Sequence, residues 1–159
     1  MQFCPSVYEH AARVIGRTPW EVSRDGALLA RGHIEAFRLY AHRPVVVGID
    51  IYNLEAEAYG ATVQRASGGG IPAITRPFIP DVEDLLRLEP FDPSRAGRVA
   101  MTLEAARAIA AACPQADVRV PVAGPFSVAA NLAGLAGLVS AVADRPDLVK
   151  AVLMHLVDG

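Results

Sequence analysis

An aspartate directly follows the most strand-like segment of the chain. Residues 45–49 (Val-Val-Val-Gly-Ile) are a short apolar run rich in β-branched residues, typical of a parallel strand covered on both faces. Asp50 stands at its carboxyl end, where barrel enzymes hold their catalytic groups, and a carboxylate there can stabilise positive charge on a substrate. Together with the family resemblance given below, this position makes Asp50 the candidate catalytic residue, with arginine pairing or helix capping as the alternative. Because the strand's own side chains hold the fold, replacing Asp50 is expected to cost little stability.

Further polar residues are candidates for binding a substrate. Tyr52 and Asn53 follow Asp50, and lining a pocket or forming its turn are equally supported for both. Glu57 lies in a short helix that we expect Asn53 to cap. Its carboxylate can face a barrel mouth, although an acidic residue near a helix start also simply favours the helix dipole. Asn131 joins this set through the family resemblance given below.

The spacing of cysteines and histidines predicts no metal site in these residues. Cys4 and Cys113 are far apart, and neither has a second cysteine at C-x-x-C spacing. None of the four histidines stands at ligand spacing with either cysteine. We expect both cysteines to be ordinary reduced thiols and the histidines to be packed or solvated.

Charge and composition exclude several classes of protein. With 52% hydrophobic and 20% charged residues, the chain has the balance of a globular protein with a sizeable core. The net charge is −2 and the 15 basic residues are spread singly, so no nucleic-acid footprint is present. The first residues lack the basic and apolar parts of a signal peptide, and Pro and Gly interrupt the most apolar region, residues 118–142. We expect a cytoplasmic protein that binds neither nucleic acid nor membrane.

Two apolar strands separated by helices indicate an α/β protein with a parallel sheet. The second strand is expected at residues 118–122. The helices expected around the strands cover residues 5–16, 25–42, 80–88, 92–112, 127–142 and 146–157. A capping box, Thr18-Pro19-Trp20-Glu21, starts one further short helix. Two strands are too few for a closed eight-stranded barrel, which takes about 250 residues, so the architecture looks interrupted.

Five segments, in order, resemble the uroporphyrinogen decarboxylase superfamily. They are Gly-Ile-Asp-Ile with Glu-Ala-Glu-Ala-Tyr-Gly-Ala-Thr-Val (48–63), then 71–80, 83–93, 120–127 with Gly-Pro-Phe-Ser, and 144–149. The resemblance covers nearly the whole chain. It implies that residues 1–159 are one domain, the amino-terminal part of an incomplete (β/α)8 TIM barrel, preceded by helices.

The superfamily contains decarboxylases that act on tetrapyrrole acetates and methyltransferases that move a methyl group between a corrinoid protein and a thiol. Asp50 matches an aspartate that the decarboxylases keep at this strand end, where it can hold pyrrole N–H groups. The arginine-rich loop of the decarboxylases is missing after Thr18-Pro19, and Asn131 stands where they have a tyrosine. Missing guanidinium groups weaken the binding of substrate carboxylates. Residues 55–60 resemble the methyltransferase branch, which we favour.

The resemblance also sets expectations for cofactors and partners. The methyltransferase branch uses zinc to activate a thiol, with ligands in a carboxyl-terminal half that this sequence lacks, so no cofactor is expected in the chain itself. Expected partners are a corrinoid protein or a small-molecule substrate, together with the missing half or a second copy of the chain. Two other functions stay open: a uroporphyrinogen decarboxylase of tetrapyrrole biosynthesis, and a non-catalytic subunit that completes a barrel with another chain.

Overall fold

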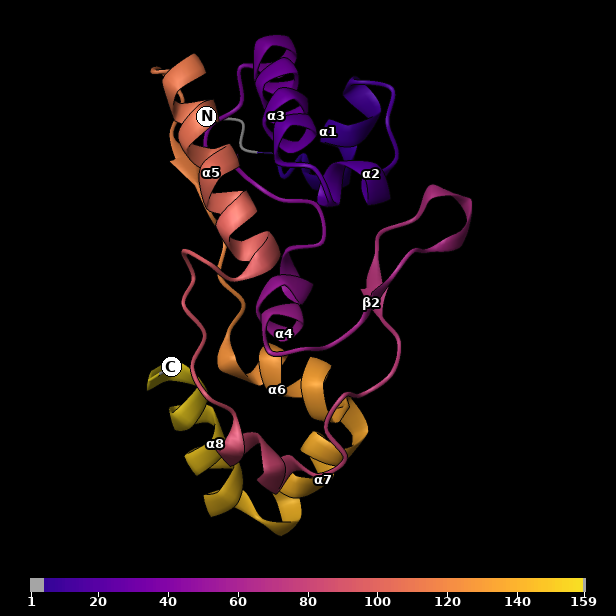
Figure 1. Ribbon diagram of the computed structural model, residues 1–159, viewed down its shortest axis with the longest axis vertical. Coiled ribbons are helices and arrows are strands. Elements are labelled where there is room, and N and C mark those ends of the chain that lie inside the picture. Colours follow the sequence, from indigo (N-terminus) through magenta and orange to yellow (C-terminus); the bar gives the residue numbers. More distant parts are fainter. Residues whose placement is uncertain (1–4, 159) are drawn as a thin grey trace.

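The computed structural model describes residues 5–158, which form two helical bodies, each with its own buried core (Figure 1). The first body contains α1 (Tyr8–Val14), α2 (Pro19–Ser23), α3 (Gly26–Tyr40), β1 (Val45–Val46), α5 (Gly97–Ala112) and β4 (Val118–Arg119). Strands β1 and β4 pair in parallel, with Val45 opposite Val118. Leu29, Phe37 and Ile109 pack around the sheet from α3 and α5. The α/β class and the parallel pairing expected from the sequence are confirmed.

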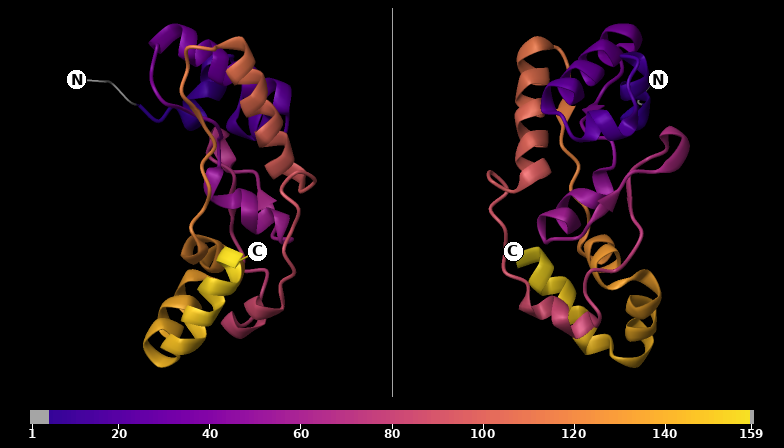
Figure 2. Two further views of the ribbon diagram at one scale, coloured as in Figure 1. Left: turned by 90° about the vertical axis from the view of Figure 1, so that its left-hand side faces the viewer. Right: turned by 45° about the vertical axis from the view of Figure 1, so that its right-hand side comes forward.

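The second body consists of the segments that follow each parallel strand (Figure 2). It contains the 3-10 helices η1 (Ile51–Asn53), η2 (Ser67–Gly69) and η3 (Val82–Arg87), helices α4 (Leu54–Ala58), α6 (Pro125–Ala133), α7 (Leu135–Asp144) and α8 (Pro146–Asp158), and an antiparallel hairpin of β2 (Val63–Gln64) and β3 (Ala73–Ile74). Leu85, Leu132, Leu138 and Val152 are fully buried in its core.

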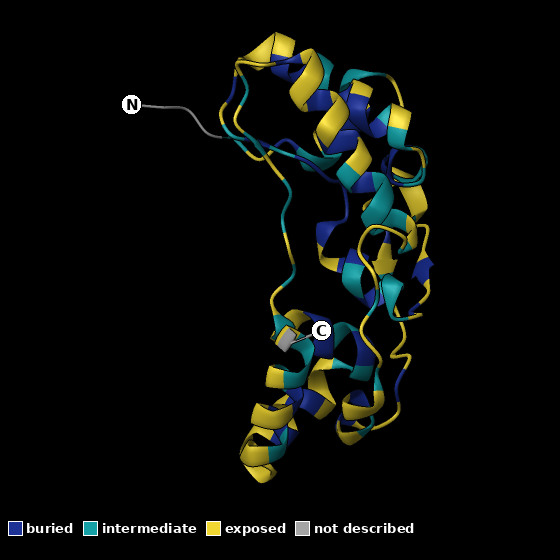
Figure 3. Cartoon of the chain, turned by 60° about the vertical axis from the view of Figure 1, so that its left-hand side comes forward, coloured by how far each residue is buried: buried dark blue, intermediate teal, exposed yellow. Residues whose placement is uncertain are grey.

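The two predicted strands are shorter than expected, and for different reasons. Beyond β1, Val47 and Ile49 stay buried in the first core, so that run is covered as predicted. Beyond β4, residues 119–127 are all exposed or partly exposed, and the connection to α6 crosses between the bodies in the open (Figure 3). Val122 is 81% exposed. In the described part of the chain, no strand pairs with β4 on the edge away from β1. The prediction of a buried strand over 118–122 is therefore wrong.

Local capping signals in the first body are confirmed. Thr18 and Glu21 form the predicted capping box, in which the Glu21 amide donates to Thr18 and the Thr18 amide donates to the Glu21 carboxylate. Asp25 begins α3 by accepting hydrogen bonds from the amides of Ala27 and Leu28. Both motifs work within four residues; the capping box at Thr18 was predicted from the sequence, and the cap at Asp25 was not.

The single helix expected over residues 127–142 is instead two helices. They meet at Gly134, whose φ of 88° suits glycine, and their axes are bent by 114°. A Cβ at this position would lie 3.0 Å from Pro77, so the close approach of the hairpin also requires glycine. The amides of Phe78 and Ile79 donate to the Leu132 carbonyl at the end of α6. Tertiary contacts therefore set the break.

Two other predicted helices begin later or wind more tightly. The expected helix over 80–88 is the 3-10 helix η3, with Asp81 accepting from the Glu83 amide. The long helix expected from 92 begins at Gly97, because Asp92 folds back on the Ser94 amide in a turn.

Within residues 5–158, no single helix has the length and hydropathy to cross a membrane, while the bent pair α6 and α7 meets that test only when the two are joined.

A buried histidine joins α3 to the end of β1. The Nε2 atom of His33 lies 3.1 Å from the amide nitrogen and 3.2 Å from the carbonyl oxygen of Gly48. Burial lowers the pKa of His33 from 6.5 to about 4, although the Gly48 carbonyl favours the protonated ring, and His42 adds repulsion. His33 is therefore neutral in the folded protein over the physiological range.

We predict that the folded chain loses stability as the pH falls from 6.5 to about 4. In this window the unfolded chain binds a proton at His33 that the folded chain does not, so acid favours unfolding, by about 3 kcal/mol in total. Urea unfolding across this range measures the slope. His33→Gln should remove the contribution of His33 to the pH dependence of the free energy of unfolding. His10→Gln, at an exposed site, is the control and should leave that contribution in place. Equal pH dependences in the unchanged chain and both variants would disprove the role given to His33.

Candidate functional site

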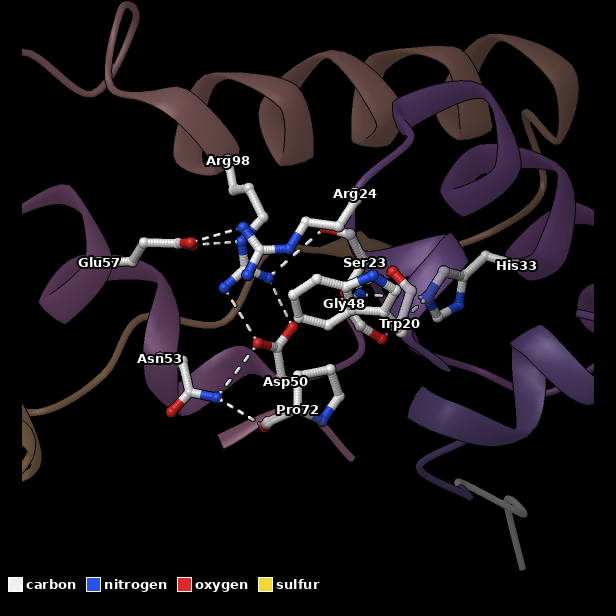
Figure 4. A network of polar contacts seen from close by, with 10 residues as sticks. All are labelled: Trp20, Ser23, Arg24, His33, Gly48, Asp50, Asn53, Glu57, Pro72 and Arg98. Carbon is white, nitrogen blue, oxygen red and sulfur yellow. Dashed lines mark hydrogen bonds and ion pairs between the residues drawn. The ribbon is translucent and has the colours of Figure 1, made fainter. Parts of the chain in front are cut away.

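A buried arginine stands at the centre of a charge network beyond β1 (Figure 4). Both terminal nitrogens of Arg98 donate to Asp50, Nη1 to Oδ1 at 2.6 Å and Nη2 to Oδ2 at 3.0 Å. Its Nε donates to Glu57, which also accepts from Arg24 Nη1 at 2.5 Å. The side chains of Asp50 and Arg98 are only 2% and 8% exposed. Two guanidinium groups thus neutralise two carboxylates at the carboxyl end of a parallel strand.

Each member of the network comes from a different element. Asp50 follows β1, Glu57 lies on α4, Arg24 ends α2, and Arg98 lies in the first turn of α5. The Arg24 guanidinium also stacks 4.5 Å from the centre of the Trp20 ring. The network therefore joins the two helical bodies at the point where β1 ends.

The backbone before Asp50 depends on a glycine. Gly48 has a φ of 147°, and a Cβ there would lie 2.3 Å from Cγ2 of Ile51. Its amide and carbonyl both face His33. This tight turn directs the chain so that the Asp50 carboxylate reaches Arg98.

Asn53 connects Asp50 to the hairpin. Its Nδ2 donates to Asp50 Oδ2 at 3.1 Å and to the Pro72 carbonyl at 2.9 Å. The expectation that Asn53 caps the following helix is wrong, because its side-chain oxygen accepts no hydrogen bond from an amide of that helix. Asn53 and Asp50 are therefore brought together, as neighbouring site residues, by a contact that the sequence did not predict.

Burial and charge act in opposite directions on Arg98. Burial alone would lower the pKa of the guanidinium, but hydrogen bonds and attraction from Asp50 and Glu57 outweigh it and raise the pKa above its ordinary value. Arg98 is therefore charged at every pH at which the protein is folded. A carboxylate offers about four acceptor positions, and Asp50 uses three of them on Arg98 and Asn53.

The remaining predicted residues lie in two places. Glu57 is inside the network, paired with two arginines. Tyr52 and Asn131 meet each other instead: Asn131 Nδ2 donates to the Tyr52 carbonyl at 2.6 Å, and the Tyr52 side chain projects outward, with the residue 64% exposed. The structure thus brings Asp50, Asn53 and Glu57 together and places Tyr52 and Asn131 in a second contact. Substrate binding by any of them stays a prediction.

The two arginines were missed from the sequence. One signal was available, because Arg98 lies at the beginning of the long helix, where a positive charge is unfavourable to the helix dipole and so indicates a tertiary partner. Pairing of Asp50 with an arginine was the stated alternative to a catalytic role, and this pairing is present. The two descriptions are compatible, since one acceptor position of Asp50 remains.

Hollows lie beside α4, and one of them adjoins the network. One, of about 460 Å³, is lined by residues that include Arg24, Glu57, Gly97 and Arg98. Another, also of about 460 Å³, lies beyond Glu55, whose Oε1 accepts the Ala123 amide at 2.9 Å, and is otherwise mostly apolar. Space for a ligand is therefore present on both sides of α4.

The residues present do not fit a zinc ion. Across the described residues 5–158, no three side chains of His, Cys, Asp or Glu are grouped closely enough to hold a metal. Cys113 is a buried free thiol, and Cys4 lies outside the described residues. Zinc in a carboxyl-terminal half stays a prediction.

We predict that Arg98→Met destabilises the chain by about 3 kcal/mol or more, because it leaves the buried Asp50 carboxylate without its partner. For the same reason, we predict a larger stability cost for Asp50→Asn than the sequence alone indicated. Urea unfolding gives the value, and the double variant Arg98→Met with Asp50→Asn should recover part of the loss.

The matched control is Arg38→Met, which breaks an exposed ion pair with Glu35 on α3. Its cost should stay within about 1 kcal/mol. Equal costs for Arg98→Met and Arg38→Met would show that the buried network contributes no more than a surface pair.

Comparison with known proteins gives this geometry a family context. The chain superposes on a methyltransferase from Methanosarcina mazei with a TM-score of 0.83 and 21% sequence identity, covering 99% of this chain and 47% of that one. It thus spans about half the length of that protein, with which it shares the fold. Among curated proteins, none matches the chain. The family model described as Uroporphyrinogen decarboxylase (URO-D) matches residues 2–159. Since this match extends over practically the whole sequence, the chain belongs to the uroporphyrinogen decarboxylase family.

Proposed function

We propose that this chain is the amino-terminal half of a methyltransferase that moves a methyl group between a corrinoid protein and a thiol. The observation that carries the proposal is the occupancy of Asp50, whose carboxylate accepts three hydrogen bonds from Arg98 and Asn53. With about one acceptor position left, Asp50 cannot hold the several pyrrole N–H groups of a tetrapyrrole substrate at once. This favours the methyltransferase branch over the decarboxylase branch.

The pairing of the arginines supports the same choice. A tetrapyrrole with many carboxylates needs guanidinium groups that are free to bind it. Both arginines of the network are already engaged by carboxylates of the chain: Arg24 by Glu57, and Arg98 by Glu57 and Asp50. The network is therefore better suited to holding the strand ends in place than to binding an anionic macrocycle.

The fold neighbour agrees with this branch, since it is a methyltransferase, and its greater length leaves room for the remaining part of a barrel. We propose that the other part supplies the zinc ligands and covers the outer edge beyond β4, where Val122 is exposed. A second copy of the chain covering this edge is the alternative. A cytoplasmic location stays a prediction from the sequence.

We assign proposed roles to the site residues. Asp50 orients the substrate or stabilises its charge through its remaining acceptor position. Asn53 holds Asp50 by a hydrogen bond, and Glu57, which pairs with Arg98, lines the adjoining hollow. Tyr52 presents its ring at the same end of β1, and Asn131 supports the backbone of Tyr52. These two form the outer part of the proposed binding site.

We predict that the protein comprising this chain and the remaining barrel transfers methyl groups from a methylated corrinoid to a small thiol. In this reaction the thiol proton is released, a bond forms between sulfur and the methyl carbon, and the cobalt–carbon bond breaks, with cobalt keeping its electron pair. The change in corrinoid absorbance measures the rate. Release of carbon dioxide from uroporphyrinogen would instead establish the decarboxylase, and neither reaction would favour the non-catalytic subunit.

In that complete protein, Asp50→Asn should lower turnover by on the order of 100-fold, because an orienting and charge-stabilising group is lost. Some stability is lost as well, since Asp50 is buried against Arg98. Rates are therefore corrected for the folded fraction, measured by urea unfolding of the same sample. Asp117→Asn, at an exposed carboxylate before β4, is the control that should change neither value. Unchanged activity of folded Asp50→Asn would make Asp50 purely structural.

A further inference from the structure

We propose that the hairpin of this chain docks the protein partner of the site, by binding an acidic surface on that partner. The hairpin arm is residues 61–78, which contain β2, β3 and the glycine-rich tip at residues 67–70. It stands away from the helices in Figure 1 and in the right-hand view of Figure 2. The inference rests on the proposed function, because only a methyl carrier that is a protein needs such a surface.

The hairpin arm has a one-sided charge. Two of the 15 basic residues, Arg65 and Arg76, lie on it, and none of the 17 acidic residues does. Both arginines are exposed, and within the described residues neither forms an ion pair. The rest of the chain carries a net negative charge, so the arm is a local positive feature on an acidic protein. Its charge is complementary to an acidic surface.

Exposed apolar side chains accompany these arginines. Ile71 and Phe78 are large hydrophobic residues of the arm that are about half exposed. Apolar and aromatic groups beside arginine are the composition that distinguishes protein interfaces from other surface. A small-molecule substrate does not require such an extended projection, whereas a protein partner does.

The hairpin arm is attached to the charge network at Pro72, between its tip and β3. Asn53 donates one N–H to the Pro72 carbonyl in the arm and the other to Asp50 (Figure 4). At its carboxyl end, the arm is held by hydrogen bonds from the amides of Phe78 and Ile79 to the Leu132 carbonyl. A partner bound to the arm is therefore directed to the end of β1, where the proposed chemistry takes place.

The occupant that fits best is a protein with an acidic surface, which under the proposed function is the corrinoid protein. A nucleic acid would also be attracted by arginines, but two of them on a chain of net charge −2 do not form the extended basic surface that phosphate binding requires. A second copy of this chain is the other alternative, and the experiment separates it.

The experiment measures binding of the 159-residue chain to two probes, a methylated corrinoid protein with an acidic surface and a polyglutamate peptide. Arg65→Glu with Arg76→Glu should weaken binding of both probes by about 10-fold or more and reduce its dependence on salt. Arg107→Glu, at an exposed position on α5, is the matched control and should change binding less than about 2-fold. Circular dichroism and the single variant Arg65→Glu verify that the fold is retained.

The outcomes separate this inference from the proposed function. Binding of the corrinoid protein that is unaffected by the arm substitutions overturns the docking inference and leaves the proposed function standing. Arm-dependent binding of polyglutamate without binding of the corrinoid protein supports the docking surface and contradicts the proposed function. Binding of neither probe overturns the docking inference. The docking inference is also overturned if sedimentation shows that the arm substitutions act only by dissociating a dimer of the chain.

Discussion

The buried charge of Arg98 is the constraint on which the rest of the structure depends. A guanidinium with so little exposure is tolerated only when carboxylates surround it, and Asp50 and Glu57 supply them from two different elements. Meeting that requirement fixes the first turn of α5 against the end of β1 and against α4. The two helical bodies, which have separate cores, are thereby joined by charge at the strand end.

The same constraint limits the chemistry that this end of the sheet can perform. A carboxylate that balances a buried arginine has little capacity left for a substrate with several N–H donors. A site of this kind is rigid and electrically neutral, which suits the positioning of a small reacting group. It is less suited to gripping a large polyanion, for which unpaired guanidinium groups would be needed. The choice between the two branches of the family thus follows from which carboxylates and guanidinium groups already have hydrogen-bond partners within the chain.

The outward-facing parts complete this description. Beyond β4 the chain runs exposed between the bodies, and the hairpin arm projects on the other side of α4 (Figures 1 and 3). Both features lie on segments that follow the parallel strands, the end at which barrel proteins place their functional loops. Asn53 links the arm to the buried network through hydrogen bonds, so the exposed and buried parts of the site share one anchor. A buried network that holds the strand end in place and an arm that projects from it are consistent with a protein that binds a partner at this edge.

The sequence by itself determined the features that depend on near neighbours. The capping box at Thr18, the apolar run before Asp50 and the family motifs are all local, and each is where it was expected. Only the tertiary structure decided the break at Gly134, the exposure beyond β4 and the partners of Asp50. The physical reason is distance along the chain: Arg98 is 48 residues from Asp50, and Pro72 is 19 residues from Asn53. Periodicity and capping rules describe turns of a helix or strand, whereas a buried charge finds its partner only after the helices have packed.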